Sequence, residues 1–125
     1  MNFPANTKFS EEHEWVVVDG DIATIGVTDF AQQQLGDIVF VEIETEGETL
    51  NKGEVFGTIE AVKTVSDLFM PISGEIIEVN PNLEASPELV NKDPYAEGWM
   101  LKVKMSKKSE LDGLMDAAAY KAHIG

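Results

Sequence analysis

Two alternating apolar runs on either side of Lys63 constrain the fold of this chain more than any other feature. One run leads from Glu54 into the lysine through the segment GTIEAVKTVSD at residues 57–67. The second leads away from it through the segment MPISGE at residues 70–75. Side chains alternate between the two faces of a sheet, so each run predicts a strand with one buried face. Lys63 then lies near the turn of a β-hairpin, and a tight turn would hold its amine out in water.

Further apolar runs predict additional strands. Residues 15–18 and 22–25 flank a short turn centred on Gly20, which is a strong hairpin signal because glycine can adopt a positive φ. Residues 38–43 have the composition of a mostly buried strand, and residues 74–79 form another predicted strand. Together with the hairpin around the lysine, these runs predict a mainly β protein.

The last predicted strand lies near residues 99–105, where large apolar side chains recur at every second position. Such alternation requires one buried face and one face in water. We expect the buried face to consist of Trp99, Leu101, Val103 and Met105. We expect the exposed face to consist of Met100, Lys102 and Lys104.

Short helices are predicted between and after the strands. Thr28 can cap a helix over residues 29–35, which Gly36 would close. Residues 83–90 suggest one or two helical turns interrupted at Pro87, since proline disrupts a helix interior. We expect these helices to lie at the margins of the sheet.

A C-terminal helix is predicted after Ser106 or Ser109, either of which could cap it. Gly113 weakens this helix and is expected to break it near Asp116. An apolar stripe at helical spacing predicts the face that packs on the sheet. This stripe consists of Leu111, Leu114, Met115, Ala118 and Ala122.

The composition suits one compact domain spanning residues 1–125, because 43% of the residues are hydrophobic and no linker interrupts the chain. The predicted architecture is a flattened β-barrel or β-sandwich with marginal helices and a C-terminal helix. Gly57 and Gly74 are expected at close backbone approaches rather than at a ligand. We expect the protein to be a monomer.

The formal net charge of −14 limits the possible partners. An acidic surface repels phosphate backbones and anionic lipids, which argues against nucleic acid and membranes as partners. It could steer the chain to basic patches on partner enzymes, or it could serve solubility alone. No apolar run approaches the length needed to cross a bilayer, and residues 1–10 show no secretory signal. We expect the cytoplasm of a bacterium or archaeon, with a trimmed organellar protein as the alternative.

The sequence gives little support to an enzyme. It contains two histidines, His13 and His123, no cysteine and no Gly-x-Ser-x-Gly segment, so nucleophilic triads are poorly supported. No glycine-rich loop of the phosphate-binding type is present, and no ligand spacing indicates a metal site. A lysine on a hairpin could simply aid solubility, so the role of Lys63 has to be judged from its surroundings.

Those surroundings resemble a carrier domain, in which a mobile cofactor arm is amide-linked to a lysine. Biotin carriers usually flank that lysine with methionines, whereas Val62 and Thr64 stand here. Lipoyl domains of 2-oxoacid dehydrogenases usually have an acidic residue before it, and Val62 is not acidic. Nearly the whole chain is similar to the H proteins of the glycine cleavage system. The matching segments are HEWV (13–16), ATIGVTDFA (23–31), LGD (35–37), EAVK (60–63), PISGE (71–75), SPELVN (86–91), DPY (93–95) and GWM (98–100).

The resemblance implies a non-catalytic carrier with lipoate attached to Lys63. Glycine decarboxylase would load an aminomethyl group onto the arm, aminomethyltransferase would pass its carbon to tetrahydrofolate, and dihydrolipoamide dehydrogenase would reoxidise the dithiol. A lipoate-attaching enzyme would modify the lysine first. Two alternatives remain open: a lipoyl-relay or sulfur-metabolism role for an H-like protein, and an interaction module that has lost the arm.

The resemblance also implies acidic residues beside the loaded arm. An amine that keeps its proton cannot expel the thiolate, and nearby carboxylates would favour the protonated form. By resemblance these carboxylates are Glu14 and Asp67, with Glu12 and His13 as weaker candidates. Glu14 could instead be an exposed strand residue and Asp67 a turn residue. Glu60, expected on the exposed face of its strand, could serve the attaching enzyme, as could Ser66 with Asp67.

Overall fold

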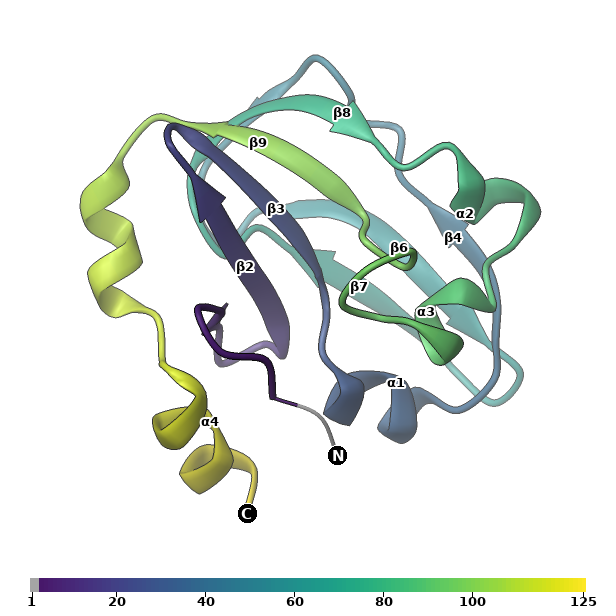
Figure 1. Ribbon diagram of the computed structural model, residues 1–125. Helices are drawn as coiled ribbons and strands as arrows, with labels where there is room; N and C mark the ends of the chain where they lie inside the picture. Colours follow the sequence, from purple (N-terminus) through teal and green to yellow (C-terminus); the bar gives the residue numbers. More distant parts are fainter. Residues whose placement is uncertain (1–2) are drawn as a thin grey trace.

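The computed structural model, which describes residues 3–125, consists of two antiparallel sheets with helices at their margins (Figure 1). Met1 and Asn2, part of the predicted domain of residues 1–125, lie outside the described residues. The large sheet has the order β1 (Lys8–Phe9), β2 (Glu14–Asp19), β3 (Ile22–Val27), β9 (Leu101–Met105), β8 (Gly74–Val79) and β5 (Thr49–Leu50). The small sheet has the order β4 (Ile38–Glu42), β6 (Val55–Ala61) and β7 (Val65–Phe69).

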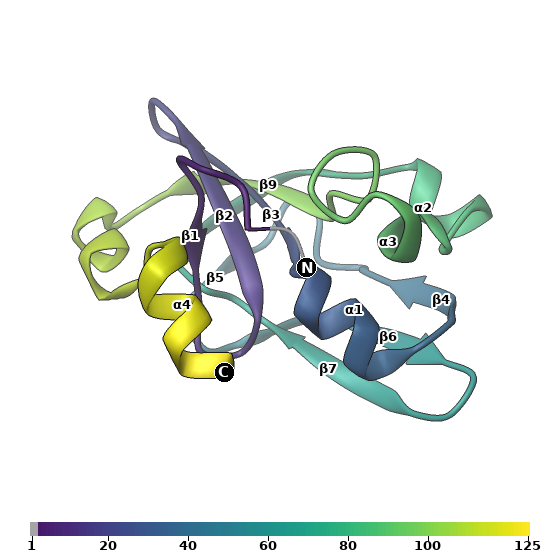
Figure 2. The same ribbon diagram turned by 60° about the horizontal axis from the view of Figure 1, so that its bottom comes forward.

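The main hydrophobic core contains side chains from both sheets, whose layers face each other in Figure 2. Ile25 and Val103 of the large sheet and Ile59 of the small sheet are each 0% exposed. These residues occupy the inward positions of their alternating strands, as the period of two requires. The predicted flattened sandwich is therefore confirmed.

The first helices form where the sequence predicted them. Helix α1 (Asp29–Leu35) starts at Thr28, whose hydroxyl accepts a hydrogen bond from the Ala31 N–H at 3.1 Å, and it ends at Gly36 with a φ of 81°. Two single-turn helices, α2 (Asn82–Ala85) and α3 (Leu89–Lys92), follow β8 on either side of Pro87. Among residues 3–125, no helix is long and apolar enough to cross a membrane.

The alternation predicted before β9 is wrong at its first two positions. Met100 is completely buried and Trp99 is partly exposed, the reverse of the expected faces. Regular pairing of β9 begins only at Leu101, so the two preceding residues are not held to the faces that alternation would assign. Trp99 lies instead beneath the ammonium of Lys102, 5.2 Å from its ring centroid. From Leu101 onward the predicted buried face is correct.

The C-terminal helix begins later than predicted. A 3-10 helix, η1 (Lys108–Gly113), precedes α4 (Ala117–Ile124), so the expected break near Asp116 is confirmed. Asp116 caps α4 by accepting a hydrogen bond from the Ala119 N–H at 2.8 Å, and neither Ser106 nor Ser109 is the cap. The break also changes which helical face is buried.

The buried face of α4 is centred on Tyr120, which is 0% exposed and stacks on Phe9. Ala118 and Ala122 of the predicted stripe are exposed. The interruption at residues 114–116 resets the helical phase, so a stripe extrapolated from Leu111 no longer matches. The predicted packing of the C-terminal segment on the sheet is therefore confirmed, and Leu111, Leu114 and Met115 of the stripe do pack against the core, but α4 itself packs through Tyr120 rather than through Ala118 and Ala122.

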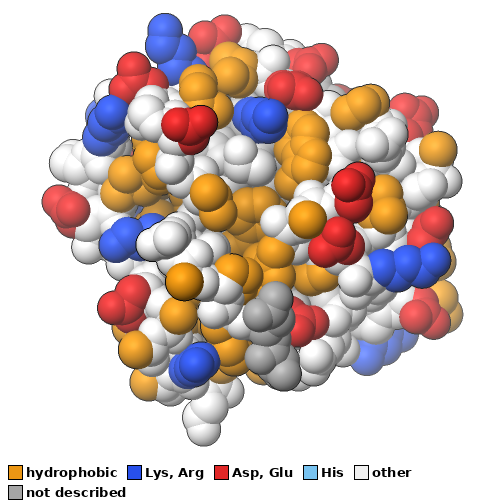
Figure 3. All heavy atoms as spheres, viewed as in Figure 1, with side chains coloured by type: hydrophobic (Ala, Val, Ile, Leu, Met, Phe, Trp, Pro, Cys, Tyr) orange, Lys and Arg blue, Asp and Glu red, His pale blue; other side chains and the backbone are white. Residues whose placement is uncertain are grey.

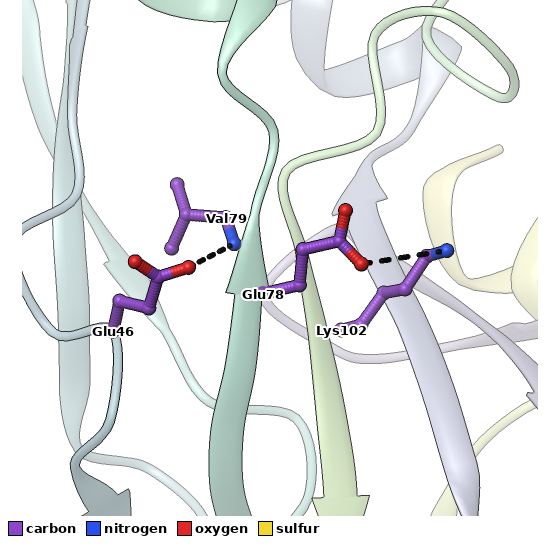
Figure 4. Close-up of polar contacts among 4 residues, drawn as sticks. All are labelled: Glu46, Glu78, Val79 and Lys102. Carbon is purple, nitrogen blue, oxygen red and sulfur yellow. Dashed lines mark hydrogen bonds and ion pairs between the residues drawn. The ribbon is translucent and has the colours of Figure 1, made fainter.

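Polar contacts at the end of β8 connect it to neighbouring segments (Figure 4). Glu46, in the connection between β4 and β5, accepts a hydrogen bond from the Val79 N–H at 3.2 Å. Glu78 and Lys102 approach to 3.8 Å across β8 and β9, an exposed pair that contributes little stability. On the face shown in Figure 3, acidic side chains and lysines together surround a central hydrophobic area.

Candidate functional site

The turn between β6 and β7 presents Lys63 to solvent. Val62, Lys63 and Thr64 are all exposed, between the buried end of β6 at Ala61 and the start of β7. The Ala61 N–H donates to the Thr64 carbonyl at 2.7 Å and closes the turn. The prediction that Lys63 lies on an exposed hairpin turn is confirmed.

The connection between α1 and β4 also holds this turn in place. The Val62 N–H donates to the Asp37 carbonyl at 3.0 Å, which ties the turn to the connection between α1 and β4. The Lys63 side chain lies against Gly36, where an added Cβ would meet the lysine Cε at 3.4 Å. The turn is therefore supported from outside as well as closed by its own hydrogen bond.

The strands that carry the turn alternate as predicted. Ile59 and Ala61 point into the core, whereas Glu60 is exposed. On the same outer face Asp67 is exposed and lies opposite Thr58. An added Cβ at Gly57 would lie 2.5 Å from the Glu42 carbonyl oxygen, and one at Gly74 would lie 2.3 Å from the Lys104 carbonyl oxygen, so both glycines serve close backbone approaches.

A cavity of about 370 Å³ lies near the other end of β7. Segments distant in the sequence form its walls, which include Ser10, Glu12, Glu14, Lys52, Phe69 and Leu114. Glu12 and Glu14, two of the predicted arm-docking residues, thus line the same space. Asp67 and His13 are not among its lining residues.

Glu14 is buried, with 2% of its surface exposed, so the alternative of an exposed strand residue is wrong. The Ser10 hydroxyl donates to its Oε1 at 2.6 Å, and the Phe69 backbone N–H also bonds to the carboxyl group. Burial outweighs these hydrogen bonds and raises the pKa of Glu14 to about 8, with a smaller contribution from the nearby charge of Glu12. The cavity wall therefore carries a carboxyl group that is mostly protonated at pH 7.

His13 serves the packing of the C-terminal helix instead of the cavity. Its φ is 68°, and its Nδ1 lies 2.9 Å from the Tyr120 hydroxyl, which in turn lies 2.8 Å from the Thr28 hydroxyl. Burial lowers the pKa of His13, and the neighbouring His123 lowers it further. Within residues 3–125, no group of three or more His, Cys, Asp or Glu side chains could hold a metal ion.

Several residues of this arrangement were not predicted. Ser10 and the Phe69 N–H, which bind the Glu14 carboxyl, and Asp37, which holds the turn, act through contacts between distant segments. A serine four residues before a buried glutamate is a weak local signal. Nothing in the local sequence around Asp37 indicates a backbone contact to residue 62.

Comparison with known proteins identifies the family. The model of the glycine cleavage H-protein family matches residues 7–125. The chain belongs to this family. Its members carry lipoate in the glycine cleavage system, so the chain is a lipoyl carrier of that system.

Individual relatives support the same assignment. The chain is 64% identical to the glycine cleavage system H protein of Bacteroides fragilis over 99% of this chain and 98% of that protein. It is 58% identical to the H protein of Symbiobacterium thermophilum over 97% of this chain and 94% of that protein. The crystal structure of the H protein from Mycobacterium marinum superposes with a TM-score of 0.88 at 35% identity, over 98% of this chain and 99% of the other.

Proposed function

We propose that Lys63 is the attachment residue and carries lipoate as an amide on Nζ. The observation that supports this most is the exposure of Lys63 on a turn that two separate hydrogen bonds hold in place. An attaching enzyme needs an accessible amine in a defined position, and a held turn supplies both. The resulting arm projects into solvent from a stiff base.

Bound lipoate would supply a dithiolane, which can be reduced while it accepts an aminomethyl group. The protein itself is proposed to be non-catalytic, and its own residues place the arm. A tether on Lys63 raises the local concentration of the arm at each partner without releasing it to solution. The proposed partners are glycine decarboxylase, aminomethyltransferase, dihydrolipoamide dehydrogenase and a lipoate-attaching enzyme. The proposed location is the bacterial cytoplasm, in keeping with the bacterial relatives.

The cavity around Glu14 is the proposed docking place for the loaded end of the arm. Strand β7 connects the two sites, because it begins two residues after Lys63 and ends at Phe69, whose N–H bonds to Glu14. A cationic amine entering the cavity would favour the charged carboxylate, so Glu14 would give up its proton as the amine docks. The carboxylate would then keep the amine protonated, and the cavity walls would limit contact with water.

The other predicted docking residues have unequal support. Glu12 lines the cavity and can add negative charge at its entrance. Asp67 lies on β7 between the two sites but on the open face of the small sheet, so we propose that it guides the arm rather than encloses its end. His13 is proposed to act only indirectly, because its ring nitrogen contacts Tyr120.

Intact mass tests the attachment. Protein produced in a lipoylation-competent host should show one lipoyl increment that is lost in Lys63→Arg. Lys52→Arg is a matched control, since Lys52 is also an exposed lysine in a turn between strands, and it should keep the increment. An unmodified wild-type protein, or an increment retained in Lys63→Arg, would exclude Lys63 as the attachment residue.

Reconstitution tests the proposed partners. Lipoylated protein should support glycine–bicarbonate exchange with purified glycine decarboxylase, and the unmodified protein should not. A lipoylated protein that fails in exchange but donates its lipoyl group to another carrier would indicate the relay role. Intact mass shows whether the lipoyl arm is attached, and the exchange assay shows whether the attached arm serves glycine cleavage.

A further inference from the structure

The side chain of Asn91, on helix α3, bonds to helix α1, to its closing residue Gly36 and to the start of β4. Its amide nitrogen donates to the Gly36 carbonyl at 2.8 Å and to the Gln32 Oε1 at 3.0 Å. Its amide oxygen accepts from the Ile38 N–H at 2.9 Å. One side chain thus bonds to Gln32 in the middle of α1, to Gly36 that closes this helix, and to Ile38, the first residue of β4.

The chemistry of the partners fixes the orientation of this amide. A carbonyl oxygen can only accept and a backbone N–H can only donate, so the Asn91 nitrogen must face Gly36 and its oxygen must face Ile38. Both N–H groups and the oxygen of the amide are therefore used. Val90, the preceding residue, is 0% exposed and anchors α3 in the main core. We call the Asn91 side chain and its three hydrogen bonds the clamp. Through Val90 and α3, the clamp is fixed to the hydrophobic core.

The clamped segment is the same one that supports the lysine turn. Asp37, between the two clamped residues, accepts from the Val62 N–H at 3.0 Å. Gly36 lies under the Lys63 side chain, and Ile38 pairs with Ala61 at the end of β6. Asn91 therefore holds one side of a three-residue segment whose other side contacts the turn.

We infer that Asn91 is a positioning residue for the attachment turn: it fixes residues 36–38 so that they hold Val62 and Lys63 in the geometry that partner enzymes recognise. This inference rests on the proposed attachment at Lys63. Asn91 does not contact the lysine and acts only through the segment that it clamps. Sequence-distant helix α3 thereby contributes to the lysine site.

A second asparagine, Asn80, which is buried, provides a matched control. Asn80 also makes three side-chain hydrogen bonds, donating to the Glu97 and Trp99 carbonyls at 2.9 and 2.8 Å and accepting from the Asn82 N–H at 3.0 Å. None of these partners belongs to the turn or to residues 36–38. Asn80→Ala and Asn91→Ala thus remove the same number of bonds, and only one removal affects the clamp.

Amide hydrogen exchange of the unmodified protein tests the mechanical part of the inference. In Asn91→Ala, the Val62 and Ile38 amides should exchange about tenfold faster than in the wild type under conditions where both remain folded. The Ala61 amide, bonded within the turn, is an internal reference and should change less. In Asn80→Ala the Val62 amide should keep its wild-type rate. Equal acceleration in both variants would overturn the inference, because Asn91 would then contribute only general stability.

Lipoylation kinetics with the purified attaching enzyme test the functional part. Asn91→Ala should raise the KM for the carrier by about tenfold with little change in kcat, because a loosened turn is recognised less often in the right geometry. Asn91→Asp keeps the acceptor for Ile38 but turns a carboxylate towards the Gly36 carbonyl, so it should also raise the KM. Wild-type kinetics in both Asn91 variants, or an equal defect in Asn80→Ala, would overturn the inference. A wild-type protein that is never lipoylated at Lys63 would instead refute the proposed function, and the exchange data would still decide whether Asn91 holds the turn.

Discussion

The two ends of strand β7 differ in almost every physical respect. At its start the turn exposes Lys63 to water, and hydrogen bonds to the Thr64 and Asp37 carbonyls hold this turn in place. At its other end the Phe69 N–H bonds to the buried carboxyl of Glu14 beside a cavity. The exposed end suits a group that must be reached by other proteins. The enclosed end suits a carboxyl group, such as that of Glu14, whose protonation must respond to a charged ligand entering the cavity.

The difference shows how one strand can connect the proposed attachment residue and the proposed docking cavity without either compromising the other. Exposure keeps the lysine accessible, and the turn needs only backbone contacts for its shape. The cavity depends on desolvation, which is available only where several segments meet. The predictions below test whether each end depends on the property assigned to it.

The largest expected effect concerns the buried carboxyl. The pKa of Glu14 is about 8 in the folded state and near 4.5 without burial, so between these values the folded protein holds a proton that the unfolded chain has lost. Stability should therefore fall as the pH rises from 4.5 to 8. Glu14→Gln should remove this dependence, gaining on the order of 3 kcal/mol over the wild type between pH 5 and pH 8. Urea denaturation at both pH values measures the difference.

The exposed carboxylate at Asp67 supplies the control for this experiment. Asp67→Asn removes an exposed carboxylate of the same strand and should change the free energy of unfolding little at either pH, because exposed charges contribute little stability. A Glu14→Gln variant with the same slope as the wild type would show that the cavity does not desolvate Glu14. The two ends of β7 would then not differ in the way proposed, with an exposed lysine at one end and a desolvated carboxyl at the other.

The next effect concerns the position of the amine. Moving the lysine by one residue, in Lys63→Thr combined with Thr64→Lys, keeps the net charge and an exposed amine but changes its place on the turn. Lipoylation should slow by about 10²-fold, because small displacements of a reacting group are costly. Timed intact-mass measurements with the attaching enzyme give the rate. A rate close to the wild type would mean that any amine on this turn suffices.

The general fold could be predicted because its signals are local. Alternation over residues 54–62, the glycine turn at Gly20 and the cap at Thr28 each depend on neighbours in the sequence, and the structure has a strand, a turn and a helix at these places. The exposure of Lys63 follows from the same alternation. Local patterns were sufficient wherever backbone geometry alone decides the outcome.

The remainder could not be predicted because it depends on contacts between distant segments. Glu14 is buried only because residues near 52, 69 and 114 close the cavity around it. The clamp of Asn91 joins α3 to Gly36 and Ile38, more than fifty positions earlier in the chain. Even the buried face of α4 depended on where η1 ends, which Gly113 indicated only approximately.

A smaller effect, about tenfold, is expected in the chemistry of the loaded arm. Glu14→Gln should leave lipoylation intact but accelerate ammonia release from the aminomethyl-loaded arm, because a neutral amide holds the cationic amine less strongly than a carboxylate. Asp67→Asn should accelerate it by about twofold at most, since an exposed carboxylate is screened by water. Stopped-flow or coupled ammonia assays measure both rates. Unchanged release in both variants would end the docking proposal.

The smallest effect should come from His13, next to the cavity but outside it. Burial and His123 hold the pKa of His13 below the usual 6.5, so the unfolded chain binds a proton first as the pH falls. The stability that neutral His13 contributes is therefore present above pH 6.5 and is lost as the pH drops below it. His13→Asn should flatten this acid-side loss while tolerating the positive φ, since asparagine adopts that conformation readily. Because the ring contacts Tyr120, amide exchange in α4 should report the loss first, while the Val62 amide at the far end of β7 should not respond. A Val62 amide that followed the protonation of His13 would show that the two ends are coupled and that their separation is incomplete.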